Sequence, residues 1–193
     1  MNNIKIKRFW FFFLAVFVFA LDQATKYPFR NYWKIGESYH LSPVMYFTYL
    51  QNTGSLWGMF SEHTLVLGMI SLSVSLGIVI YAWRMKDQLT LMYLTLGILL
   101  GGAMGNMYDR LVHGFVVDFF DLRWHGKNIW AIFNVADIAI DVAIVLFIWM
   151  AFTEGKSEAK PKPLAQTSPE DESRVPTEEL DPADLPSAEP PLK

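Results

Sequence analysis

Long apolar runs alternate with shorter polar segments along most of the chain. Four runs stand out, at about 9–27, 65–83, 89–108 and 129–152. At about 1.5 Å of rise per residue, a helix of such a length crosses a hydrocarbon core roughly 30 Å thick. The pattern therefore predicts an all-α integral membrane protein with four transmembrane helices.

The segment between the first two runs has a different pattern. Residues 28–61 mix polar with aromatic side chains and include a strand-like stretch at 44–50. Trp and Tyr side chains favour the interface between lipid and water. We therefore expect a small extramembrane segment with some β-structure, lying on the membrane surface between the first and second helices.

The N-terminal run permits two interpretations. Lys5, Lys7 and Arg8 precede it, and a basic start before an apolar stretch is also typical of a cleavable signal peptide. However, the run continues to Asp22 and Lys26, whose i, i+4 spacing places both charges on one face of a helix. This pair favours a retained helix over a leader that is removed.

The basic start also predicts the orientation of the chain. Positive residues stay on the cytoplasmic side of a membrane, and a compact basic N-terminus dominates this preference. With four spans, both termini are expected in the cytoplasm. Asp118 and Asp137 are then expected near the outer face.

The end of the chain has the composition of a disordered segment. Residues 154–193 are rich in Pro, Glu, Ser and Asp and have almost no aromatic residues. Such a segment cannot bury enough apolar surface to offset the entropy of ordering it. We expect a membrane-embedded domain at 1–153, followed by a disordered cytoplasmic tail with no catalytic part.

Composition narrows the class of protein. The chain has 193 residues, of which 52% are hydrophobic, and is too apolar for an ordinary soluble domain. It has no cysteine, which excludes a disulfide framework, a thiolate metal site and a cysteine nucleophile. The net charge of -3 reflects the acidic tail, since the segments that flank the membrane are basic. Nothing here supports a nucleic-acid partner.

Two carboxylates lie among large apolar residues. Asp118 follows Val116 and Val117, and Asp137 lies at the start of the fourth run. An Asp at mid-bilayer depth costs roughly 2.5 to 3.5 kcal/mol, so it usually faces a protein interior or a wet cavity. Two carboxylates about 3 Å apart share a proton, and can then activate water and polarise a peptide carbonyl. The sequence thus predicts an aspartic-protease-type dyad.

The same residues permit a simpler explanation. Asp118 could cap a helix, and Asp137 could lie in the first turn of the fourth span, where the helix dipole favours negative charge. Asn52-Thr53-Gly54 could likewise be only a turn. Spacing alone does not choose between these interpretations and the dyad.

Neighbouring polar residues add two expectations. Asp141 lies one turn below Asp137 on the same helical face, so we expect it to be protonated or hydrogen-bonded in a supporting role. His113 and His125 flank Asp118 but have no His-x-x-x-His type of spacing. We therefore expect no metal site.

The third run ends in a glycine-rich motif. Gly101 and Gly105 have the spacing through which helices pack closely. Close packing would allow Asn106 and Arg110 to project into a shared interior. Asp109 and Arg110 could instead form an ion pair at the membrane interface.

Taken together, these motifs resemble the signal peptidase II family, the lipoprotein signal peptidases of bacterial inner membranes. The resemblance covers about 7–152 and leaves out the tail. The motifs that carry it, in chain order, are Asp22-Gln23-Ala24-Thr25-Lys26, Asn52-Thr53-Gly54-Ser55, Gly101-Gly102-Ala103-Met104-Gly105-Asn106-Met107-Tyr108-Asp109-Arg110, Val117-Asp118-Phe119 and Phe133-Asn134-Val135-Ala136-Asp137.

The resemblance implies a membrane aspartic endopeptidase that removes signal peptides from prolipoproteins, cutting before a cysteine that carries a diacylglyceryl group. It implies no cofactor, contact with membrane lipid, and a monomer, since one chain supplies the site. Asp118 and Asp137 become the catalytic residues. The residues that shape the site or hold the substrate become Asp22, Lys26, Asn52, Gly54, Asn106, Arg110, Asn134 and Ala136.

A rival function belongs to another class. A small four-span transporter or proton-relay protein would line a polar path with Asp118, Asp137 and Asp141. It would depend on Asp141 as much as on Asp137, whereas the peptidase would depend little on Asp141.

Overall fold

The structure is a computed structural model that describes residues 3–54, 63–86 and 89–158. Ser55 of the second motif, the rest of the predicted exterior segment to residue 61, and residues 159–193 of the predicted tail lie outside the described residues. Met1–Gly155 form one compact unit.

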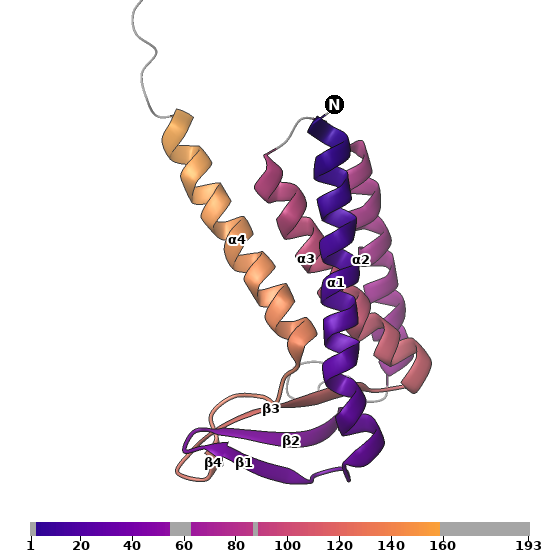
Figure 1. Ribbon diagram of the computed structural model, residues 1–193, viewed down its shortest axis with the longest axis vertical. Coiled ribbons are helices and arrows are strands. Elements are labelled where there is room, and N and C mark those ends of the chain that lie inside the picture. The colour runs from indigo at the N-terminus through magenta and orange to yellow at the C-terminus, as the bar shows by residue number, and fades with distance from the viewer. Residues whose placement is uncertain (1–2, 55–62, 87–88, 159–193) are drawn as a thin grey trace, which may run out of the picture. The chain divides into compact units, whose positions relative to one another are not determined.

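In the part of the chain that the structure describes, long α-helices make up most of the fold (Figure 1). They are α1 (Asn3–Tyr32), α2 (Thr64–Arg84), α3 (Thr90–Tyr108) and α4 (Val135–Glu158), and α3 continues as a short π-helix, η2 (Asp109–His113). Among the described residues, three stretches are helical, long and apolar enough to cross a membrane, namely Thr64–Arg84, Thr90–His113 and Val135–Thr153.

The first helix extends beyond its predicted end. We expected an exterior segment from Pro28, but α1 includes this proline and ends at Tyr32. Phe29, in the last turn, is buried in a cluster with Tyr49, Val117 and Phe119, and its ring stacks on that of Phe119 at 4.4 Å between centroids. This tertiary packing outweighs the cost of a proline inside a helix, which is about 3 kcal/mol.

The fourth helix begins later than predicted. The apolar run starts near residue 129, but α4 starts at Val135. The residues before it are extended because Phe133 pairs with Phe120 of a strand, with N–H···O distances of 2.8 and 3.1 Å. A backbone engaged in this pairing cannot also form helical hydrogen bonds.

A four-stranded antiparallel sheet lies at one end of the helices (Figure 1). Its strands are β1 (Ser38–Ser42), β2 (Met45–Asn52), β3 (Val116–Trp124) and β4 (Lys127–Asn128), in that order across the sheet. The prediction of β-structure between the first two helices alone was incomplete, because β3 and β4 follow the third helix. Val116 to Phe119 are buried in succession, so β3 lacks the alternation that marks a half-exposed strand.

Glycines allow α1 and α3 to approach closely. A Cβ atom added at Gly97 would lie 2.6 Å from the backbone oxygen of Phe11 in α1. One added at Gly101 would lie 2.7 Å from the backbone oxygen of Ala15. The expected packing role of the glycine motif is therefore confirmed at Gly101. Gly105, one turn further, has the carboxylate of Asp22 against it, so the same face of α3 brings a charged side chain of α1 into the interior.

Candidate active site

Asp118 lies within β3 and does not cap a helix. Its side chain is buried, and both carboxylate oxygens accept hydrogen bonds from amides. Asn52 Nδ2 donates to Oδ2 at 2.9 Å, and Asn134 Nδ2 donates to Oδ1 at 2.6 Å. Asn52 comes from β2, whose pairing with β3 places it opposite Val116. Antiparallel pairing of β2 with β3 thus brings the Asn52 amide to the Asp118 carboxylate.

Asp137 lies in the first turn of α4, and it forms a capping box with Asn134. The Asn134 side-chain oxygen accepts from the Asp137 N–H at 3.0 Å, and Asp137 Oδ2 accepts from the Asn134 N–H at 3.1 Å. This reciprocal pair satisfies two otherwise unpaired donors at the helix start. Asp137 therefore does lie in the first turn of a helix, as the simpler explanation held. That role uses only one of its carboxylate oxygens, Oδ2.

The other oxygen of Asp137 joins it to Asp118 through two amides. Asn106 Nδ2 donates to Asp137 Oδ1 at 2.7 Å, and Asn134 Nδ2 lies 3.2 Å from Asn106 Oδ1. Since Asn134 also donates to Asp118, the two carboxylates belong to one hydrogen-bonded network. Asn106 and Asn134 are both buried, so they hold these positions away from solvent.

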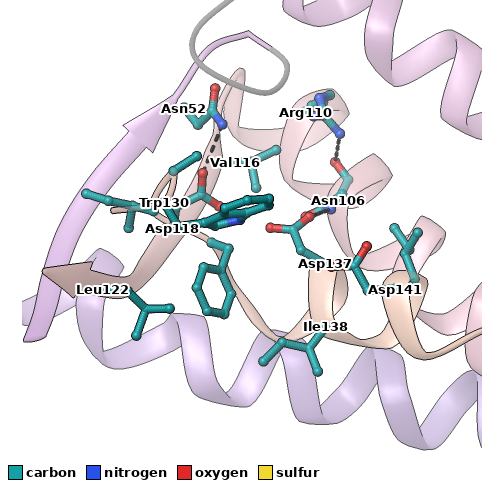
Figure 2. Close-up of a pocket in the computed structure, with 14 residues that line it drawn as sticks. Asn52, Asn106, Arg110, Val116, Asp118, Leu122, Trp130, Asp137, Ile138 and Asp141 are labelled. Carbon is teal, nitrogen blue, oxygen red and sulfur yellow. Dashed lines mark hydrogen bonds between the residues drawn. The ribbon is translucent and has the colours of Figure 1, made fainter. Parts of the chain in front are cut away.

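Both carboxylates line one cavity of about 570 Å³ (Figure 2). Polar and apolar side chains both line the cavity, and Asp141 is among them. The polar lining is Asn52, Asn106, Arg110, Asp118, Asp137 and Asp141, and the apolar lining is Val116, Leu122, Trp130, Ala131, Ile132, Phe133, Ile138 and Ile140. The cavity therefore places carboxylates beside apolar side chains.

The environment of Asp118 favours its neutral form. Burial, and after it the adjacent Asp137 carboxylate, raise the pKa of Asp118 from 3.8 to about 7. The hydrogen bonds from Asn52 and Asn134 act in the opposite direction. Near neutral pH, Asp118 can therefore both hold a proton and release it, as a general acid must.

Arg110 lies across the cavity from the sheet and has an unused donor. It contacts the backbone oxygens of Asn106 and Gly54 at 3.4 Å, and the Gly54 N–H donates to Asn52 Oδ1 at 3.0 Å. Its Nε is buried without a hydrogen-bond partner among the residues that the structure describes. This group could donate to a carbonyl of a bound peptide.

The predicted pair of Asp22 and Lys26 is in contact and fully buried, with 2.8 Å between Oδ2 and Nζ. Asp22 Oδ1 also accepts from the N–H of Ala136 at 2.9 Å, at the start of α4. Lys26 Nζ donates to Asn106 Oδ1 at 3.1 Å. All the site residues predicted from the sequence are thus connected by hydrogen bonds or ion pairs, Gly54 and Ala136 through their backbone atoms.

The alternative of an interfacial ion pair between Asp109 and Arg110 does not hold, because Asp109 pairs with Lys26 at 2.9 Å and is buried. No local pattern in the sequence indicates this partner, because the two residues are far apart in the chain. Trp130, which lines the cavity, was also missed. It precedes α4, in residues that had been assigned to the helix.

The histidines do not join the carboxylates. His113 Nε2 lies 2.8 Å from Arg30 Nη1, and His125 lies between β3 and β4 with a φ of 49°. Within residues 3–54, 63–86 and 89–158, no group of three or more His, Asp or Glu side chains could hold a metal ion. The chemistry available to the cavity is that of carboxylates, amides and a guanidinium.

Comparison with known proteins gives a consistent result. A family described as signal peptidase (SPase) II matches residues 14–153. A curated lipoprotein signal peptidase of a Shewanella baltica strain is 38% identical over 151 residues, covering 76% of this chain and 88% of the relative. One from Moorella thermoacetica is 37% identical over 141 residues, covering 72% and 90%.

Solved structures agree with the sequence matches. A bacterial membrane enzyme determined by the in meso method at 2.3 Å resolution superposes with a TM-score of 0.68 at 32% identity, covering 79% of this chain and 92% of its own. A second, at 1.9 Å resolution, gives a TM-score of 0.62 at 32% identity and covers 72% and 90%.

Proposed function

The chain belongs to the signal peptidase II family, whose members cleave signal peptides from prolipoproteins, and we propose that it does so as an aspartic peptidase with Asp118 and Asp137 as the catalytic pair. One observation carries the proposal. Both carboxylates line one cavity and are joined through the amides of Asn106 and Asn134. Two carboxylates with different environments are the usual basis for separate acid and base roles.

The proposed reaction is hydrolysis of a peptide bond. The ionised carboxylate of the pair takes a proton from water, and the resulting hydroxide attacks the scissile carbonyl carbon. The protonated carboxylate donates to the carbonyl oxygen, which gives a tetrahedral intermediate. As the C–N bond breaks, the first carboxyl group gives its proton to the leaving nitrogen. The second carboxylate takes a proton back from a hydroxyl of the intermediate, which becomes the new carboxylic acid. The pKa of Asp118, raised to about 7, suits the acid role.

The proposed substrate is a prolipoprotein whose cysteine carries a diacylglyceryl group, cut just before that cysteine. The cavity supports this proposal because hydrophobic side chains form most of its lining beside the carboxylates. Arg110 is proposed to fix the substrate backbone through its buried, unused Nε–H. Asn52 and Gly54 are proposed to shape the site, because the Gly54 N–H donates to Asn52 and the Gly54 oxygen lies 3.4 Å from Arg110. No cofactor takes part in these steps.

We also propose that α1 is a fourth transmembrane helix. Phe9, Phe13 and Phe17 are exposed along one of its faces and stack on one another, which suits contact with lipid chains. The N-terminus of α1 and the far end of α4 lie at one end of the helices, and the sheet lies at the other (Figure 1). This arrangement supports both helix ends on one side of the membrane and the site near the other. The basic start of the chain supports the cytoplasm as the side of the helix ends, which leaves the site near the outer face of the bacterial inner membrane. A monomer suffices, because one chain supplies every site residue.

The proposal is tested by cleavage of a diacylglyceryl-modified prolipoprotein by the purified protein in detergent. We expect Asp118→Asn and Asp137→Asn each to lose at least about 100-fold in kcat, because each removes one half of the acid–base pair. Asp141→Asn should retain most activity, and an unlipidated substrate should not be cut. Circular dichroism checks that the variants are folded.

The controls separate this function from a proton-relay protein. Activity that survives in a folded Asp118→Asn or Asp137→Asn variant would exclude the dyad. Loss of activity in Asp141→Asn equal to that in Asp137→Asn would favour a polar path along α4 over a site at one face of the membrane.

A further inference from the structure

Three charged side chains lie buried behind the cavity and do not line it. Lys26 Nζ lies 2.8 Å from Asp22 Oδ2 and 2.9 Å from Asp109 Oδ2, and all three side chains are 0% exposed. Burying an ion triad carries a large desolvation penalty, so such a triad is weak evidence of stabilisation by itself. Its other contacts show what it does.

Each carboxylate of the triad is bonded to the segment that carries one catalytic Asp. Asp22 Oδ1 accepts from the N–H of Ala136 at 2.9 Å, and Ala136 precedes Asp137. Asp109 Oδ2 accepts from the N–H of Val117 at 3.2 Å, and Val117 precedes Asp118. Because the Lys26 ammonium joins the two carboxylates, the triad fixes the first turn of α4 relative to β3.

The triad also sets the orientation of an amide. Lys26 Nζ lies 3.1 Å from Asn106 Oδ1. An ammonium only donates, so the oxygen of the Asn106 amide must face it. The Asn106 nitrogen then faces Asp137 and donates to Oδ1 at 2.7 Å. A donated hydrogen bond stabilises the ionised form of a carboxylate.

We propose that the triad of Asp22, Lys26 and Asp109 is a positioning device that holds Asp118 and Asp137 at a fixed separation and makes Asp137 the ionised base. Asp118 is left as the acid. Asp109 is thus a positioning residue and touches no reacting atom. This inference rests on the proposed function, since it assigns the base and acid roles within the proposed dyad.

The charged neighbours of Asp137 and Asp109 determine which substitution tests the positioning role of the triad. The charged groups around Asp137 come from four elements and are Lys26, Arg110, Asp118 and Asp141. Asp109 also lies 3.9 Å from Arg30 Nη1, and Arg30 contacts His113. Asp109→Asn leaves Lys26 paired with Asp22, so no buried ammonium is left without a carboxylate.

The test compares the pH profiles of wild type and Asp109→Asn with the diacylglyceryl-modified prolipoprotein as substrate. Loss of one partner lets Lys26 move and frees the Asn106 amide to turn its oxygen toward Asp137. We expect kcat to fall about 10-fold with KM unchanged. The acidic limb of the kcat profile should move up by about one pH unit, because the ionised Asp137 loses a donor.

Asp121→Asn is the matched control. Asp121 is also a buried carboxylate, lies in the same strand as Asp118, and pairs with Arg123 outside the cavity. We expect this variant to have a lower thermal unfolding temperature and an unchanged acidic limb. A merely structural role for Asp109 predicts the same behaviour in both variants.

Asp22→Asn tests the proposal from the other end of the triad and serves if Asp109→Asn does not fold. Its acidic limb should move in the same direction, because Lys26 again loses one partner. A folded variant of either kind with the wild-type profile, or with a raised KM and unchanged kcat, would overturn the inference. The proposed function is judged separately in the same experiment. If the Asp118→Asn and Asp137→Asn variants are inactive, the proposed catalytic pair stands although the role of the triad is overturned.

Discussion

Asn134 shows how one residue can serve both folding and the site. Its side-chain oxygen caps α4 by accepting from the Asp137 N–H, while its side-chain nitrogen donates to Asp118. The same amide therefore starts the helix and orients a carboxylate of the proposed catalytic pair. Because the cap binds Asp137 and the nitrogen binds Asp118, this one side chain contacts both carboxylates of the pair.

At the scale of single residues, the raised pKa of Asp118 predicts the pH dependence of cleavage. A carboxyl group with a pKa of about 7 is protonated below that value and ionised above it. If Asp118 is the general acid, kcat should fall as pH rises above about 7, by about 10-fold for each further unit. Stopped-time assays between pH 5 and 9 measure this. A kcat that stays constant to pH 9 would exclude Asp118 as the acid.

At the scale of elements, the position of α4 depends on its contact with α3. A Cβ atom added at Gly102 would lie 2.6 Å from the backbone oxygen of Ala136. A backbone atom in the first turn of a helix cannot move aside alone, so α4 must shift and Asp137 with it. The close approach is therefore required for the site as well as for packing.

Gly102→Ala is expected to lower kcat at least about 10-fold, since displacing a reacting group by a fraction of an ångström is costly, and also to lower the unfolding temperature. Gly77→Ala in α2 is the control, because a Cβ atom there would meet nothing within 4 Å. It should leave both quantities unchanged or raise the unfolding temperature. Equal cleavage by the two variants would show that α4 tolerates displacement.

At the scale of the whole molecule, the membrane orientation can be tested because the chain has no cysteine of its own. Tyr39→Cys in β1 and Asn3→Cys at the start of α1 each introduce one thiol at an exposed position. In intact spheroplasts, a membrane-impermeant maleimide should label the thiol at position 39 and not the one at position 3. Labelling of both in lysed cells is the control, and the reverse pattern would invert the orientation.

The sequence by itself determined that the chain is largely made of long apolar helices, it predicted a pair of carboxylates as the site, and its motifs indicated the family to which the chain belongs. Apolar runs of bilayer length predict helices from local composition alone, and carboxylates in apolar surroundings are costly enough to indicate a site. Asp118 and Asp137 were identified on that basis, and the structure brings both to one cavity.

Only the tertiary structure decided which groups meet. β3 is buried in succession at residues 116–119, so its pairing with β2 leaves no periodic signal in the sequence. Asp109 meets Lys26, and Phe133 meets Phe120, through contacts between segments that local pattern does not connect. Partners of this kind are set by the packing of whole elements. For that reason the sequence named the two carboxylates, and the fold alone showed what holds them together.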